Sequence, residues 1–100
     1  MSNAVWFISY KLVKGSSTEE FLQVSETLFD KVISPKKGFI YWKQLVEGDT
    51  WVDFTEWETM EDAKNFEANS DPNDPFAAKF YSFIDFDSLK SNFYTVKKSY

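Results

Sequence analysis

The apolar and polar positions of this chain follow two periods, and each change of period marks a new element. In residues 5–13 every even position is apolar or aromatic, whereas the odd positions include Ser9 and Lys11. This alternation, over β-branched and aromatic residues, predicts a strand. The even positions that share its apolar face are Trp6, Ile8, Tyr10 and Leu12.

A helical period follows after a turn at residues 14–16. Ser17 and Glu20 have the spacing of a capping box, in which side chains satisfy the free backbone donors of a helix start. Pro35 ends the pattern. The stripe of apolar residues at 3.6 spacing consists of Phe21, Leu22, Val24, Leu28, Phe29, Val32 and Ile33.

Two apolar runs, residues 39–46 and 50–57, flank a short turn that contains Gly48 and predict a β-hairpin. Large apolar side chains occur at both parities of these runs. In a regular strand, Phe39, Tyr41 and Leu45 lie on one face and Ile40, Trp42 and Val46 on the other. Both faces of the predicted sheet are therefore apolar.

The remaining chain predicts two short helices and a last strand. Thr59 is a suitable cap for a helix that carries Met60, Ala63 and Phe66 and ends in the loop at residues 70–73. Asp74 and Pro75 fit the cap and first position of a second helix. Residues 89–96 are the predicted strand. The apolar face of the second helix would comprise Phe76, Phe80, Phe83 and Ile84.

The predicted order is β-α-β-β-α-(α)-β, which indicates a single α+β domain over residues 1–100. This is a ferredoxin-like sandwich with helices on one face of a four-stranded antiparallel sheet. An antiparallel sheet normally keeps a polar outer face, but here that face is apolar. We therefore expect a homodimer in which a second copy covers the open sheet face.

Composition excludes several classes of function. The 100 residues contain no Cys and no His, which removes disulfide and thiolate chemistry and the usual zinc and haem ligands. The net charge is -5 and all 11 basic residues are lysine, which disfavours nucleic acid as a partner. No apolar run is long enough for a membrane span, and no signal sequence is recognisable, so we expect a cytoplasmic protein.

Residues 57–63 (Trp-Glu-Thr-Met-Glu-Asp-Ala), with the later Pro-Phe-Ala-Ala-Lys-Phe helix, carry a family resemblance. The chain resembles the antibiotic biosynthesis monooxygenase-like families of the dimeric α+β barrel superfamily, over nearly its whole length. The resemblance implies a dimeric barrel. Such proteins include cofactor-free oxygenases of polycyclic phenols or quinols, haem-degrading oxygenases, isomerases and proteins without an assigned role, so the fold alone does not choose among these activities.

The haem-degrading branch can be tested residue by residue. Its site combines an Asn of the first strand, a Trp at the end of the third strand and a haem-binding His of a later helix. Only Trp57 matches, because the other two positions hold Ile8 and Phe80. We therefore expect neither haem nor any other cofactor or metal.

A cofactor-free oxygenase needs an aromatic pocket, a base and donors for the resulting anion. Without His, the base is a buried carboxylate or lysine. We favour Asp53, an unusual charge in an apolar strand, over Lys11 and Lys43. Tyr10 or Tyr81 would donate to the oxyanion. The expected pocket lies between sheet and helices and is lined by Trp6, Ile8, Trp57, Phe66, Phe80 and Tyr81.

Each assignment has a structural alternative. Asp53 would pair with Lys43 across the hairpin if it faced the solvent or the dimer seam. Trp57 would be a packing residue, and the aromatic residues would fill the core of a non-catalytic binding or structural module. RNA-recognition domains share the element order, but their basic aromatic motif is absent here and the net charge has the wrong sign.

Overall fold

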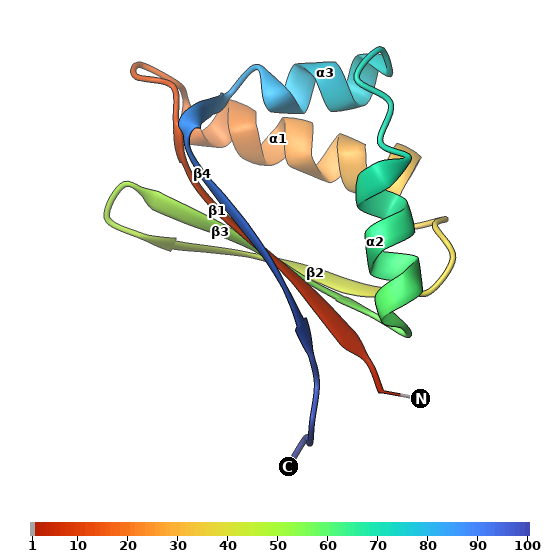
Figure 1. Ribbon diagram of the computed structural model, residues 1–100. Helices are drawn as coiled ribbons and strands as arrows, with labels where there is room; N and C mark the ends of the chain where they lie inside the picture. Colours follow the sequence, from red (N-terminus) through yellow and green to blue (C-terminus); the bar gives the residue numbers. More distant parts are fainter. Residues whose placement is uncertain (1) are drawn as a thin grey trace.

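The computed structural model describes residues 2–100 and has the predicted element order (Figure 1). Four strands form one antiparallel sheet in the order β2-β3-β1-β4, and all helices cover the same face of it. The predicted ferredoxin-like α+β class is confirmed. The elements are β1 Ala4–Leu12, α1 Thr18–Leu28, the π-helical turn η1 Phe29–Ile33, β2 Phe39–Glu47, β3 Thr50–Trp57, α2 Met60–Ala68, α3 Pro75–Tyr81 and β4 Ile84–Thr95.

The helices begin where the local sequence predicts, because side chains satisfy the free backbone donors there. The hydroxyl of Ser17 accepts a hydrogen bond from the backbone N–H of Glu20 at 3.2 Å. Thr59 caps α2, and Asp74 caps α3 by accepting from two backbone N–H groups. The first helix differs from the prediction in one respect. It does not continue as an α-helix to Pro35 but widens into η1.

The predicted helical face of residues 76–84 is wrong at its end. The chain leaves α3 after Tyr81, and Ile84 pairs with Leu12 as the first residue of β4, five residues before the predicted strand start. The pairing of β4 with β1 shifts near Tyr10, where the Ser88 hydroxyl accepts from the backbone N–H of Lys11 at 2.8 Å. Here a side-chain hydroxyl takes the place of a backbone carbonyl in the strand pairing, and the alternation of apolar and polar residues cannot predict such a shift.

A bulge in β2 changes which of its side chains face the helices. Phe39 pairs with Trp57, but Tyr41 pairs with Glu56, so Ile40 is an extra residue in the ladder. Phe39 and Trp42 consequently both face the helices. The predicted grouping of Phe39 with Tyr41 on one face is therefore wrong.

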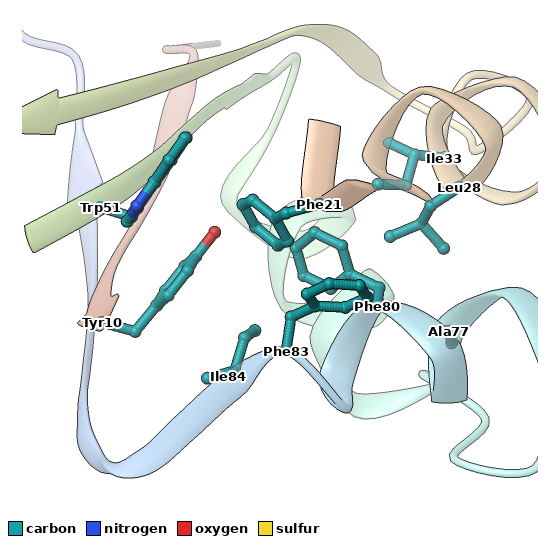
Figure 2. Close-up of a cluster of buried hydrophobic side chains, with 9 residues drawn as sticks. All are labelled: Tyr10, Phe21, Leu28, Ile33, Trp51, Ala77, Phe80, Phe83 and Ile84. Carbon is teal, nitrogen blue, oxygen red and sulfur yellow. The ribbon is translucent and has the colours of Figure 1, made fainter. Parts of the chain in front are cut away.

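Most of the core lies between β1, β3 and the helices α1 and α3 (Figure 2). Phe21 is fully buried at its centre, where its ring contacts Trp51 at 5.1 Å and Phe80 at 5.2 Å between ring centroids. A smaller cluster of Ala4, Trp57 and Ala63 lies at the other end of the sheet. Two members of the predicted helical stripe, Leu22 and Phe29, are exposed rather than buried.

The face of the sheet opposite the helices carries a row of aromatic rings, one from each strand. The rings of Tyr41, Phe54, Phe7 and Tyr94 follow the strand order, with successive centroids 6.1, 6.4 and 6.3 Å apart. We call this row the aromatic ladder. The second sheet face is thus as rich in large apolar side chains as the sequence indicates.

None of the helices formed by residues 2–100 has the length and apolar character needed to cross a membrane.

Candidate functional site

A cavity of about 360 Å³ lies between the sheet and the helices, within the usual size range of small-molecule sites. Its sheet side is formed by β1, β2 and β3, and its other walls by the end of α1, the turn that follows it, α2, the α2–α3 loop and α3. The apolar wall residues are Trp6, Ile8, Leu28, Val32, Ile33, Trp42, Trp57, Phe66, Ala77 and Phe80.

The structure brings together nearly all of the predicted site residues. Seven of them line this cavity: Trp6, Ile8, Asp53, Trp57, Phe66, Phe80 and Tyr81. Trp57 has an exposed fraction of 0%, so it supports the wall by packing and presents no free surface. Tyr10 does not line the cavity, although it lies next to Asp53.

Among the described residues, Asp53 is the buried residue with an acidic side chain, and its exposed fraction is 5%. One carboxyl oxygen, Oδ1, accepts two hydrogen bonds, from the Tyr10 hydroxyl at 3.0 Å and from the Trp42 indole N–H at 3.2 Å. Among the described residues no buried polar side-chain atom lacks a partner. Oδ2 accepts no hydrogen bond, so it is not among the fully buried atoms. Because Asp53 lines the cavity, Oδ2 is the oxygen that is accessible from it.

Burial determines the acid-base properties of this pair. Desolvation raises the pKa of Asp53 to about 7, against the opposing effect of the hydrogen bonds from Tyr10 and Trp42. Burial also raises the pKa of Tyr10, and the adjacent Asp53 raises it further. Tyr10 therefore stays protonated and donates, and Asp53 exists in both protonation states near neutral pH. Such a group fits the role of a general base.

The geometry assigns Tyr10 another role than the predicted one. Its hydroxyl is occupied by Asp53 and does not reach the cavity, so Tyr10 positions the carboxyl instead of donating to an oxyanion. Of the two predicted tyrosine donors, Tyr81 lines the cavity, where its hydroxyl lies 3.0 Å from that of Ser70.

The alternative in which Asp53 faces the solvent or the dimer seam and pairs with Lys43 is wrong. The residue opposite Asp53 on β2 is Gln44, and Lys43 lies on the other face with its ammonium 5.0 Å from the Tyr41 ring centroid. Lys11 is exposed, and its ammonium lies 3.5 Å from Asp49. Neither lysine lines the cavity, so neither can serve as the base there.

Sequence reasoning missed Trp42 and part of the helical wall. The bulge at Ile40 decides which face Trp42 occupies, and no short sequence signal marked it. Leu28 and Ile33 both line the cavity because five residues separate them across the wide turn of η1, where a π-helix brings them to the same side. Among the missed rim residues, Lys36 and Lys37 belong to a turn whose position depends on tertiary packing.

No protein-family model matches this sequence, and no curated protein matches it. Solved structures do. SnoaB, a cofactor-independent oxygenase from Streptomyces nogalater, is similar with a TM-score of 0.75 at 13% identity, over 99% of this chain and 97% of that one. A Bacillus cereus protein assigned to the antibiotic biosynthesis monooxygenases gives 0.65 at 20% identity, over 100% and 98% of the two chains.

A third similar structure is a hydroxynitrile lyase from Passiflora edulis, with a TM-score of 0.68, 15% identity, and coverage of 99% of this chain and 97% of that one. One fold thus carries different reactions, and identities this low establish the architecture without the activity. The chain has the α+β fold of the antibiotic biosynthesis monooxygenase-like proteins, as its sequence resemblance predicted.

Proposed function

We propose that this protein is a cofactor-independent oxygenase of the antibiotic biosynthesis monooxygenase-like type, acting on a small, flat, phenol- or quinol-type molecule. One observation carries the proposal: the carboxyl of Asp53 has a free oxygen in a cavity whose walls are otherwise largely aromatic and aliphatic. The walls suit a flat apolar ring system, and the carboxyl suits removal of a proton from it.

In the proposed reaction, Asp53 Oδ2 accepts a proton from the substrate and leaves an electron-rich anion. Dioxygen is the co-reactant. The anion transfers one electron to dioxygen, and the two radicals combine to form a C–O bond. The resulting peroxide anion takes the proton back from Asp53, which regenerates the base, and the hydroperoxide then loses water. For an anthrone-like substrate a ring CH₂ becomes C=O, one oxygen atom stays in the product, and the other leaves as water with the two substrate hydrogens. The electrons come from the substrate, so no cofactor is required.

Tyr81 supports this chemistry as a donor to the substrate oxyanion, since its hydroxyl lies at the cavity wall beside Ser70. Trp6, Phe66 and Phe80 would hold the ring system. The indole of Trp6 packs edge-on against Phe66, with centroids 5.8 Å apart, which fixes the orientation of this wall.

We also propose a homodimer formed through the open sheet face. The aromatic ladder crosses all four strands there, and contiguous apolar surface of this kind marks an interaction site. A second copy is the simplest cover, because two identical sheets can pack face to face about a two-fold axis.

Oxygen consumption with anthrone-like and quinol substrates tests the proposed activity. Replacing Asp53 by Asn keeps the shape and removes the base, so we expect turnover to fall by at least about 100-fold. Glu56→Gln, which changes a carboxyl on the opposite sheet face, should retain activity. An Asp53→Asn variant as active as the wild type would show that Asp53 is not the base.

The alternative is a non-catalytic small-molecule-binding or structural module. The full burial of Trp57 and the internal use of the Tyr10 hydroxyl favour it, because both residues have packing or hydrogen-bonding roles without any ligand. Absence of oxygen uptake with every substrate, together with saturable binding of the same compounds, would favour this module over the oxygenase.

A further inference from the structure

The indole donors around the cavity are all used within the protein. The N–H of Trp6 donates to the Ser91 hydroxyl at 2.8 Å, and the N–H of Trp57 donates to the Thr55 hydroxyl at 2.9 Å. Trp42 donates to Asp53. The Thr55 hydroxyl itself donates to the backbone carbonyl of Trp6 at 3.2 Å, so its proton is also used.

The buried part of the cavity therefore offers a ligand one free acceptor and no free side-chain donor among the described residues. The acceptor is Oδ2 of Asp53. A ligand oxygen buried there without a donor would lose its hydrogen bonds to water, at a cost of about 1–3 kcal/mol. An O–H or N–H group, in contrast, would find Asp53. The interior therefore favours binding of the end of the ligand that carries an O–H or N–H group.

Free donors gather at the rim instead, where the half-buried hydroxyls of Tyr81 and Ser70 lie 3.0 Å apart and one of their two protons remains available to a ligand. Lys36 and Lys37, in the turn that follows η1, are exposed and line the cavity. Within residues 2–100 neither ammonium lies at ion-pair distance from a carboxylate. The side chain of Asn65 adds a neutral amide on α2. This side of the cavity can receive an acceptor or an anion.

The rim also carries three carboxylates, and local contacts engage them. Asp74 caps α3 by accepting from two backbone N–H groups, at 2.9 and 3.1 Å. Asp71 accepts from the backbone N–H of Asn73 at 2.9 Å. The carboxylate of Asp62 packs against Gly38, where it occupies the space that a side chain at that position would need. Neither lysine ammonium has such a partner among the described residues, so both are available to a ligand at the opening.

We propose that the cavity takes a flat, conjugated ligand in one orientation, with its acidic O–H or N–H on Asp53 Oδ2 and its acceptor oxygens at the rim, facing Lys36 and Lys37. This inference rests on the proposed function only in that the ligand is a flat ring compound. The proton moves from the ligand to Oδ2, and the electron pair left behind delocalises through the ring to the oxygens at the rim. The negative charge then lies beside the lysines and water, away from the interior that lacks donors.

Three naphthalene probes, measured by calorimetry near pH 8, test this orientation. 6-Hydroxy-2-naphthoate has both the donor and the acceptor, 2-naphthoate lacks the hydroxyl, and 2-naphthol lacks the carboxylate. We expect 6-hydroxy-2-naphthoate to bind about 10-fold more tightly than either of the others, because each lost contact is a hydrogen bond to a charged group.

The double variant Lys36→Met, Lys37→Met should weaken binding of 6-hydroxy-2-naphthoate by about 10-fold and leave 2-naphthol unchanged. The matched control is Lys97→Met, Lys98→Met, an adjacent lysine pair that does not line the cavity and causes the same change in net charge. It should change neither affinity.

Equal affinities for 6-hydroxy-2-naphthoate and 2-naphthol, or equal losses in the two double variants, would overturn the proposed orientation. Those outcomes leave the proposed oxygenase untouched, because binding of a flat ring would still be observed. If none of the three probes binds, the orientation and the ring-binding cavity of the proposed function both fail. Binding in the expected order without any oxygen uptake would remove the oxygenase and keep the orientation.

Discussion

Two tyrosine–carboxylate pairs lie on opposite faces of the same sheet. On the helix face, the Tyr10 hydroxyl donates to Asp53 Oδ1 at 3.0 Å, and on the open face, the Tyr41 hydroxyl donates to Glu56 Oε1 at 2.9 Å. The other oxygen of Glu56 accepts from the Asn3 amide at 2.8 Å. Both oxygens of Glu56 are therefore occupied, whereas Asp53 keeps one oxygen open to the cavity.

The difference shows that the pairing itself does not make a site. What distinguishes Asp53 is the combination of burial with one vacant oxygen. Tyr10 and Trp42 both bind the same oxygen, so they hold the carboxyl in place and leave Oδ2 free. Glu56 has comparable partners, but its two oxygens accept from Tyr41 and Asn3 and it does not line the cavity. We expect substitutions in the two pairs to differ accordingly.

The largest expected effect is on stability as a function of pH. Burial raises the pKa of Asp53 from 3.8 to about 7. Well below pH 4 the carboxyl is protonated in both the folded and unfolded states, so its ionisation does not affect the free energy of unfolding. Between about pH 4 and 7 the unfolded state loses the proton that the folded state keeps, so the free energy of unfolding falls as pH rises. Above about pH 7 the cost is constant, at most about 4 kcal/mol.

Asp53→Asn removes this titration. Its free energy of unfolding, measured by urea denaturation, should match the wild type near pH 4 and exceed it by up to about 4 kcal/mol near pH 8. Glu56→Gln is the matched control on the open face, and its difference from the wild type should stay within about 1 kcal/mol across this range. A constant difference between Asp53→Asn and wild type would contradict a carboxyl that titrates near neutral pH.

Substitutions on the open sheet face should instead affect the association of two copies of the chain. Phe54→Glu places a charge in the middle of the aromatic ladder, so we expect the dimer association constant to fall by at least about 100-fold in sedimentation experiments. Binding of ring probes in the cavity should be unchanged, since Phe54 lies on the other face. Phe86→Glu, an exposed phenylalanine outside the ladder, is the control. A wild-type protein that sediments as a monomer at all concentrations would contradict the homodimer.

The sequence predicted those features that depend on neighbouring residues. The caps at Ser17, Thr59 and Asp74 are local. For Asp53 the sequence left two placements open, in the pocket or paired with Lys43 across the hairpin, and the strand register decides for the helix face. Trp42 could not be placed, because one extra residue in β2 reverses the parity of all that follows.

The partners of the site residues were also beyond sequence reasoning. Tyr10 lies on the predicted face of β1. Whether its hydroxyl reaches the cavity or Asp53 depends on the register between β1 and β3, in which Tyr10 and Asp53 are more than 40 residues apart along the chain. The start of β4 was missed for a related reason, since Ile84 fits an apolar helical face equally well until its pairing with Leu12 is known. Tertiary contacts decide both.

The smallest expected effect is on the pKa of Asp53, and it distinguishes Tyr10 from Tyr41. Tyr10→Phe removes one of the two donors to Asp53 and keeps the ring, so the ionised carboxylate loses stabilisation and its pKa should rise by about 1 unit. The pKa can be measured in two ways. One is the pH at which the difference in free energy of unfolding between the protein with and without Asp53→Asn levels off, and the other is the midpoint of the Asp53 carboxyl chemical shift in a pH titration. Tyr41→Phe removes an equivalent hydroxyl on the open face and should leave that midpoint unchanged. Equal midpoints in Tyr10→Phe and wild type would mean that burial and Trp42 alone set the acidity of Asp53, and Tyr10 would then be a packing residue like Phe21 beside it.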